Sequence, residues 1–328
     1  FYLAASLVAL FFSKEVFLAA LFFLLANYFY QFSFVFYNAL LHHIAPPEKW
    51  GRISGVGQTG NWLGEIFGLL VTLPFAGGAI YLFGEVGRAQ TFLPSVALFF
   101  LLALPMLLFF KLPKKEASRE KISLKKEYKS QWRQFKELVK EPNMKYFLLA
   151  YFFFNDAIIT AMNNFPIFLN SVFKIADDTK SMLLLGILVT SAFGAYFSGW
   201  LADKIGLKKT LLYVIGGWVI LFPLLGLITN LYAFMALTVL MGFLFGSIWT
   251  ITRATMTALT PKEKLNFGFS FYTLAERVST FLGPLAWGII STLLINLGPL
   301  RYRIAIIFMA LFIAIGFYFV KKVEIKKP

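Results

Sequence analysis

Residues 199–209 read Gly-Trp-Leu-Ala-Asp-Lys-Ile-Gly-Leu-Lys-Lys, and this stretch decides the fold. It is short, charged and glycine-bearing, and it joins two strongly hydrophobic runs. Glycine permits a tight change of direction, and Lys and Arg in short connections favour the cytoplasmic side of a membrane. The stretch therefore predicts a tight turn between two membrane-spanning helices.

The composition indicates an integral membrane protein. Of the 328 residues, 59% are hydrophobic and only 14% are charged, whereas a soluble domain carries about 25% charged residues. The sequence contains no Cys, which excludes disulfides and thiol chemistry. His42 and His43 are too few for a His-rich metal site, so we expect no metal and no cofactor.

Hydrophobic runs of spanning length predict α-helices, because backbone groups in lipid must be hydrogen-bonded within their own segment. The opening run, 1–12, would be only about 18 Å long against a hydrocarbon core of about 30 Å, so we expect the chain to begin inside a helix. Nine complete spans are predicted at 16–43, 53–82, 89–111, 145–171, 181–202, 209–229, 231–256, 266–295 and 302–320.

The positive charges indicate the orientation in the membrane. When successive connections are assigned to alternate sides, 24 of the 31 Lys and Arg residues fall on one side, which the positive-inside bias makes cytoplasmic. The net charge of +15 therefore reflects topology, and we expect no nucleic-acid partner. We expect a monomer in a prokaryotic cytoplasmic membrane.

One long basic connection divides the chain. We predict an N-terminal transmembrane half at 1–112 that lacks its first two helices, a cytoplasmic linker at 113–144, and a six-helix C-terminal half at 145–328. An apolar face opposite a basic face predicts an amphipathic helix in the linker. That helix either lies on the inner leaflet or packs on the protein. Its apolar face comprises Leu124, Tyr128, Trp132, Phe135 and Val139.

The 199–209 turn resembles motif A of the major facilitator superfamily, Gly-x-x-x-Asp-(Arg/Lys)-x-Gly-x-(Arg/Lys)-(Arg/Lys). The resemblance implies an all-α bundle of six plus six helices and transport by alternating access. It also implies that Asp203 contacts a helix amino terminus or a basic partner, as part of a latch that opens during transport. The matching residues are Gly199, Asp203, Lys204, Gly206, Lys208 and Lys209.

Further segments resemble the vacuolar amino-acid effluxer-like (autophagy-related effluxer) family within that superfamily. Yeast members of this family export amino acids from the vacuole, so the resemblance implies amino-acid efflux. The segments are 37–41, 45–48, 51–55, the Tyr-x-x-x-Asn-Asp of 151–156, and 283–284.

Ionisable side chains inside membrane spans cost roughly 2.5–3.5 kcal/mol each on insertion scales. Glu65, Asp156, Glu276 and Arg277 each lie near the middle of a predicted span, where transporter sites usually lie. Polar residues gather on one face of four spans, which predicts an aqueous cavity between helices. The predicted solute and proton pathway comprises Asp156, Arg277, Glu65, Asn163, Asn61, Gln31, Asn38 and Asn155.

Asp156 is the predicted proton-coupling group. Burial favours the neutral form of a carboxylate and a nearby cation favours the ionised form, so a switchable partner would let it take up and release a proton. Arg277 is the predicted partner of Asp156, of Glu65 or of a substrate carboxylate. The alternative is a static ion pair that holds the two halves together.

Two expectations concern helix packing. Gly60, Gly64 and Gly68 have the four-residue spacing of close helix–helix packing. Pro166 and Pro284 interrupt helices and are expected to provide kinks in the spans at 145–171 and 266–295.

These patterns predict a secondary active transporter for a small polar or zwitterionic, amino-acid-like solute, with proton-coupled efflux as the finer expectation. The alternatives are a non-transporting membrane sensor or scaffold with a transporter fold, and an intramembrane enzyme. The sequence lacks the His-Glu-x-x-His and Gly-x-Ser-x-Gly motifs, which argues against an enzyme. The expected partners are a small-molecule substrate, protons, and the membrane lipids beside the linker.

Overall fold

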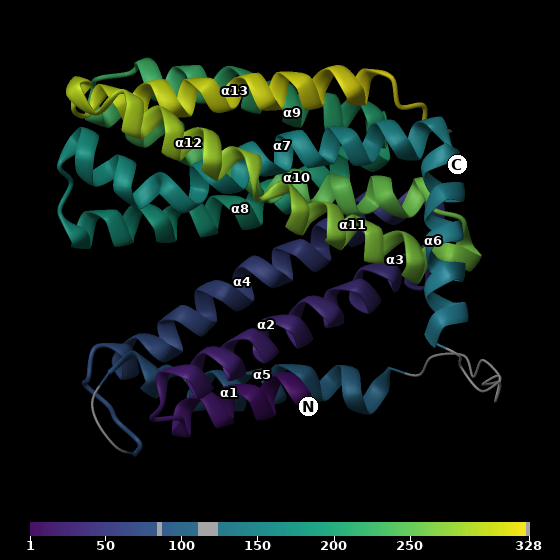
Figure 1. The fold of residues 1–328 in the computed structure, drawn as a ribbon, viewed down its shortest axis with the longest axis horizontal. Coiled ribbons are helices and arrows are strands. Elements are labelled where there is room, and N and C mark those ends of the chain that lie inside the picture. The colour runs from purple at the N-terminus through teal and green to yellow at the C-terminus, as the bar shows by residue number, and fades with distance from the viewer. Residues whose placement is uncertain (84–86, 111–123, 326–328) are drawn as a thin grey trace. The chain divides into compact units, whose positions relative to one another are not determined.

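The computed structural model describes residues 1–83, 87–110 and 124–325, and every long element in these ranges is an α-helix (Figure 1). The helices follow the hydrophobic runs of the sequence, with ends that differ by up to about six residues, and two predicted spans, 16–43 and 266–295, are each divided between two helices. Their bounds are α1 Tyr2–Phe12, α2 Val16–Ala39, α3 Leu41–Ile44, α4 Trp50–Ala76, α5 Phe92–Phe109, α6 Leu124–Lys140, α7 Pro142–Phe168, α8 Asp177–Ile205, α9 Leu207–Leu227, α10 Leu231–Leu259, α11 Leu265–Ser279, α12 Leu282–Leu293 and α13 Leu300–Lys321.

Six segments of the described chain are long and apolar enough to cross a membrane. Two further helices, α4 and α7, are equally long, but they carry many of the polar candidate residues, which lower their hydropathy. The predicted number of ten spans therefore remains a prediction. The six segments are Val16–Ile44, Arg88–Phe109, Thr179–Ile205, Leu207–Leu227, Leu231–Leu259 and Leu300–Lys321.

The chain forms two compact units. The first comprises Phe1–Phe34 with Gly64–Gln134, and the second comprises Val35–Leu63 with Phe135–Pro328. The helices α2 and α4 therefore each contribute one part to each unit. The functional halves predicted at 1–112 and 145–328 remain a prediction.

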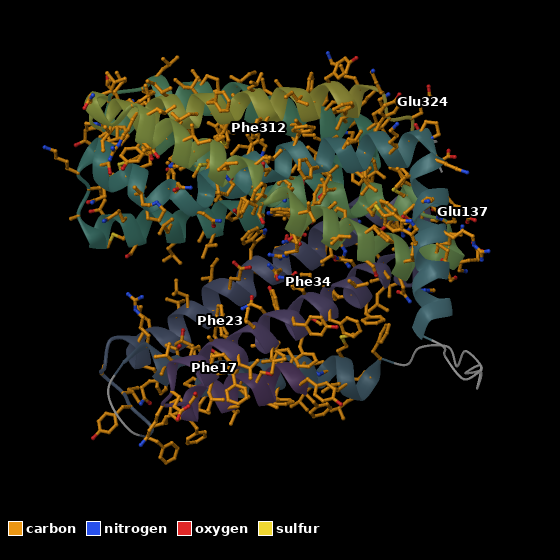
Figure 2. The ribbon with its side chains drawn as sticks, viewed as in Figure 1. Phe17, Phe23, Phe34, Glu137, Phe312 and Glu324 are labelled. Carbon is orange, nitrogen blue, oxygen red and sulfur yellow. The ribbon has the colours of Figure 1, made fainter. Side chains whose placement is uncertain are left out.

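The first unit is built on aromatic contacts between α1, α2 and α5. Phe1 packs against Phe100 with ring centroids 5.7 Å apart, and Tyr2 stacks on Phe29 at 5.1 Å. Phe17 and Phe23 project from α2 and are largely exposed (Figure 2). Exposed aromatic side chains on a helix of spanning length are suited to contact with lipid.

The second unit contains the main core. Figure 1 shows α7, α9, α10 and α13 lying lengthwise together, and α8 packs along α10. Trp218, Phe147 and Phe154 are among the largest fully buried side chains. Glycines let α8 and α10 approach closely, because a Cβ on Gly194 or Gly246 would overlap the backbone of the facing helix.

The C-terminal part of α6 packs on α11 within this unit. Phe135 stacks on Phe271 with ring centroids 4.5 Å apart, and Leu138 is buried. Glu137 (Figure 2) pairs with Lys264 at 3.2 Å. Trp132 is half exposed. The side chains of Leu124 and Tyr128, which belong to the predicted apolar face, lie outside the described residues.

The structure bears on two packing predictions. The predicted span at 266–295 is interrupted close to Pro284, because α11 ends at Ser279 and α12 begins at Leu282, whereas α7 continues through Pro166 to Phe168. No atom of the described residues lies within 4 Å of a Cβ built on Gly60 or Gly64, and at Gly68 the nearest atom, on Leu98, is 4.0 Å away. Within its own unit, none of these three glycines has a close helix neighbour, and packing on the other unit remains a prediction.

Candidate functional site

The break between α11 and α12 lies against α7, and Asp156 on α7 contacts it. The Gly283 amide donates to Asp156 Oδ2 at 2.6 Å. Gly283 is the second residue of α12, where backbone N–H groups have no partner within the helix and carry partial positive charge. A Cβ on Gly283 would overlap Thr160 Oγ1 and would lie 2.8 Å from Asp156 Oδ1. Only glycine therefore allows α12 to begin this close to the carboxylate.

Several polar atoms around this break have no hydrogen-bond partner among the described residues. They are Asp156 Oδ1, Thr160 Oγ1 and Asn155 Oδ1, on side chains that are at most 1% exposed. Asn155 is fixed by its amide nitrogen, which donates to Ser279 Oγ at 2.6 Å. Buried polar atoms are normally paired, and unpaired ones mark places where a proton, a water or a ligand acts.

A chain of hydrogen bonds and stacked rings continues from the break along α7, α10 and α11. Tyr151 donates from its hydroxyl to Glu276 Oε2 at 3.2 Å, and its ring stacks on Tyr272 with centroids 4.3 Å apart. Tyr272 in turn donates to Thr252 Oγ1 at 2.9 Å. Arg277 pairs with the other oxygen of Glu276 at 3.1 Å, and its side chain is half exposed. The arrangement links a half-buried carboxylate on α11 to α10.

The structure brings some of the predicted pathway residues together and leaves others apart. Asp156 and Asn155 both contact the break region. Arg277 pairs with its neighbour Glu276, not with Asp156, so the predicted Asp156–Arg277 pair is absent from the described contacts. Asn163 is exposed on α7. The remaining residues are Asn38, which is buried, Gln31 and Asn61, which are half-buried, and Glu65, which is exposed.

The motif A turn places Asp203 at the start of α4. The Arg52 amide, in the first turn of α4, donates to Asp203 Oδ2 at 3.0 Å. A Cβ on Gly51 would lie 2.7 Å from Gly199 O, so glycines allow α4 and α8 to touch through their backbones. Gly206 has φ +97°, a left-handed conformation that favours glycine, between α8 and α9.

The other members of the motif lie on the same turn. Lys204 lies over the Trp200 ring, with Nζ 5.0 Å from its centroid. Lys208 and Lys209 lie in the first turn of α9. Positive charge there is consistent with a turn on the basic side of the membrane.

Arg253 is a residue that the sequence analysis missed. Arg253 lies near the end of the predicted span 231–256, and its charge counts with those of the following connection, but α10 continues to Leu259 and buries Arg253 to 5% exposure. Its guanidinium lies over the Tyr37 ring at 4.5 Å, and Nη2 donates to Tyr37 O at 3.2 Å. Close by, Ser54 donates to Thr250 O at 2.8 Å. The polar positions 250, 253 and 257 recur at helical spacing and could have revealed that the helix continues.

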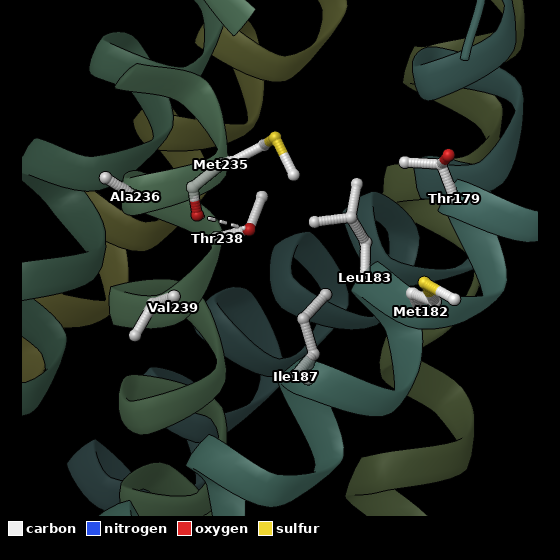
Figure 3. A pocket seen from close by; sticks show the side chains of 9 residues that line it. Thr179, Met182, Leu183, Ile187, Met235, Ala236, Thr238 and Val239 are labelled. Carbon is white, nitrogen blue, oxygen red and sulfur yellow. Dashed lines mark hydrogen bonds between the residues drawn. The ribbon is translucent and has the colours of Figure 1, made fainter. Parts of the chain in front are cut away.

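The N-terminal ends of α8 and α10 line a cavity of about 400 Å³ (Figure 3). Its lining is apolar, and the hydroxyl of Thr238 is satisfied by Met235 O at 2.7 Å. A polar solute would find no charged side chain among the described lining residues, so this cavity is not the candidate site. The lining residues are Thr179, Met182, Leu183, Gly186, Ile187, Met235, Ala236, Thr238 and Val239.

Solved structures with the same fold are transporters. The Escherichia coli fucose:proton symporter matches with a TM-score of 0.75 at 15% identity, covering 99% of this chain and 82% of the symporter. A bacterial homologue of the iron transporter ferroportin, in an outward-facing state, matches with a TM-score of 0.61 at 14% identity, covering 98% and 80% of the two chains. These matches show that the chain has the multi-pass helical fold of these transporters.

The sequence comparison names the family. Residues 50–328 match the family described as "Vacuole effluxer Atg22 like", and the chain belongs to that family. An uncharacterised protein of Aquifex aeolicus (strain VF5) is 24% identical, covering 94% of this chain and 73% of the relative. An uncharacterised MFS-type transporter of Bacillus subtilis (strain 168) is 25% identical, covering 76% and 59%. Autophagy-related protein 22 of Kluyveromyces lactis is 23% identical, and the match spans 57% of this chain and 40% of that relative's length.

Proposed function

We propose that this protein moves a small polar or zwitterionic, amino-acid-like solute across the membrane by alternating access, in the efflux direction and coupled to protons. The observation that supports coupling best is the carboxylate of Asp156. One of its oxygens accepts from the amino end of α12, and the other oxygen is buried without a partner among the described residues. The efflux direction follows the description of the family. The solute class follows the family resemblance of the sequence and the acidic and basic side chains among the predicted pathway residues.

The two protonation states of Asp156 have different consequences for α12. The ionised carboxylate accepts a charge-assisted hydrogen bond from Gly283 and interacts favourably with the helix amino terminus. A proton on Oδ1 removes the charge of the carboxylate and gives the buried oxygen a hydrogen to donate. Thr160 Oγ1 and Asp156 Oδ1 both face Gly283 on α12. Protonation therefore loosens the contact that positions the start of α12, and α12 can move relative to α7.

The cytoplasmic ends of α4 and α8 supply the second element of the mechanism. In this structure Asp203 accepts from the start of α4, and Gly51 and Gly199 are in backbone contact. We propose that residues 199–209 are a conformational latch that holds the cytoplasmic side closed, with Lys204, Lys208 and Lys209 facing the basic side. Solute entry from the cytoplasm requires this contact to open.

The proposed location is the cytoplasmic membrane of a prokaryote, with the protein acting as a monomer. Bacterial relatives cover most of the chain, and the basic connections set the orientation. The basic linker, with α6 at its end, is proposed to contact the lipids of the inner leaflet through the part that does not pack on α11.

The test is flux in reconstituted vesicles with an imposed pH gradient, using a mixture of radiolabelled amino acids as the probe. We expect the gradient to drive net transport by the wild type. Asp156→Asn should lose net transport and retain solute exchange, because its amide can still accept from Gly283 but cannot release a proton. Glu263→Gln, an exposed acid outside the spans, is the matched control.

Wild-type transport that ignores the pH gradient would refute proton coupling. Ligand binding without flux would refute transport and favour the sensor or scaffold.

A further inference from the structure

Within the described chain, Arg253 is a buried positive charge without a negative partner. Arg253 is 5% exposed, and none of the carboxylates in the described ranges forms an ion pair with its guanidinium. Its Nε has no hydrogen-bond partner among those residues either. An unpaired buried charge is strongly unfavourable, because desolvation is not compensated by a counter-charge. A purely structural role would be served better by a neutral side chain.

Arg253 contacts Tyr37 on α2 and lies close to α4. Tyr37 on α2 covers one face of the guanidinium with its ring, and its carbonyl accepts from Nη2. On α4, a Cβ at Gly57 would lie 3.1 Å from Nη1 and 3.0 Å from the Tyr37 hydroxyl. A cation–π contact and a neutral carbonyl are weaker partners than a carboxylate, so they can be exchanged for one.

One of the two segments beside Arg253, at Gly57, belongs to α4, the helix whose first turn contacts Asp203 in the latch, and the other, at Tyr37, belongs to α2. Tyr37 lies near the cytoplasmic end of α2, and Gly57 lies two turns into α4, whose first turn contacts Asp203. When α4 and α8 separate at the latch, the cover over Arg253 can separate as well. In the opening proposed for the latch, the guanidinium would then face the path by which a solute enters from the cytoplasm.

We propose that Arg253 binds the carboxylate of the transported solute, and that Tyr37 takes the place of this carboxylate when the cytoplasmic side is closed. This inference rests on the proposed function and specifies its substrate class: solutes with a free carboxylate. The guanidinium fork matches a carboxylate with two parallel hydrogen bonds, and the unpaired Nε–H supplies one of the donors. Arg277 is not suited to this role, because it is half exposed and already paired with Glu276.

The test compares amino acids with their amides, which keep the side chain and the ammonium group but lose the carboxylate charge. We would measure counterflow of radiolabelled amino acids in vesicles holding the full chain, with unlabelled amino acids or amides as competitors. The wild type should favour the acids by about ten- to hundredfold, which corresponds to a hydrogen-bonded charge pair. Arg253→Gln should reduce this preference to below about threefold, and Arg253→Lys should give an intermediate value. Arg88→Gln, which removes an exposed arginine outside the predicted pathway, is the matched control and should keep the wild-type preference.

A second measurement separates this inference from the transport proposal. Thermal unfolding in detergent, with amino acids or their amides added, reports binding without flux. Stabilisation by acids and not by amides, lost in Arg253→Gln, would support carboxylate binding even if vesicles showed no transport. An acid preference that Arg253→Gln leaves intact, or amides that compete as well as acids with the wild type, would overturn the inference. So would a protein that neither acids nor amides stabilise and that shows no counterflow.

Discussion

Removing the carboxylate of Asp203 should open the cytoplasmic side more often. In this structure Oδ2 accepts the Arg52 amide at 3.0 Å, in the first turn of α4. A charge-assisted hydrogen bond combined with a favourable helix terminus is worth about 1–1.5 kcal/mol after allowance for the exposed position of Asp203. Asp203→Ala should therefore raise the population of the open state about five- to twelvefold. Asp203→Asn keeps a neutral acceptor and should give a smaller rise.

The absence of Cys from the sequence makes the measurement direct. Ser54 is fully buried where α4 meets α10, so Ser54→Cys introduces a single thiol that is shielded while the latch is closed. The rate at which this thiol reacts with a maleimide supplied from the cytoplasmic side reports the open population. We expect the slowest reaction with the wild-type Asp203, a faster one with Asp203→Asn and the fastest with Asp203→Ala. Equal rates in the three proteins, each carrying the introduced thiol, would refute the latch.

Three other variants test the packing. Gly51→Ala should also speed labelling of the thiol introduced at position 54, because its Cβ would lie 2.7 Å from a backbone oxygen of α8 and separate α4 from α8; unchanged labelling would contradict this. Gly283→Ala should lower the melting temperature and weaken proton coupling, because its Cβ would overlap a side-chain oxygen of α7. Gly288→Ala should change neither property, because no described atom lies within 4 Å of a Cβ at that position. Trp218→Ala should lower the melting temperature far more than Ile220→Ala, because Trp218 is fully buried and Ile220 is exposed; similar shifts would show that the core is placed wrongly.

The sequence predicts the fold well because membrane helices depend mainly on local composition. Long apolar runs and the charged 199–209 turn suffice to predict the helices and the family, since every backbone group in lipid must be satisfied within its own segment. Asp156 is predictable for a related reason. A carboxylate in the middle of an apolar run is costly and therefore indicates a function.

The features that sequence could not supply depend on contacts between distant segments. The end of α11 at Ser279 has no strong local signal, and the new helix starts where the Gly283 amide meets Asp156 on α7. In the sequence, Arg253 is only a charge near the end of a predicted span, and its contacts with α2 and α4 show that it is covered. Glycine spacing at 60, 64 and 68 says nothing about whether another helix lies opposite.

The most direct test of the account is whether solute movement through the protein carries protons by way of Asp156. Vesicles containing a trapped pH-sensitive dye would be given an amino-acid gradient with no initial pH gradient. The account predicts a change of internal pH with the wild type and with Glu263→Gln, and none with Asp156→Asn, although labelled solute still exchanges in that variant. Solute flux through the wild type without any pH change, or an equal pH change in Asp156→Asn, would contradict it.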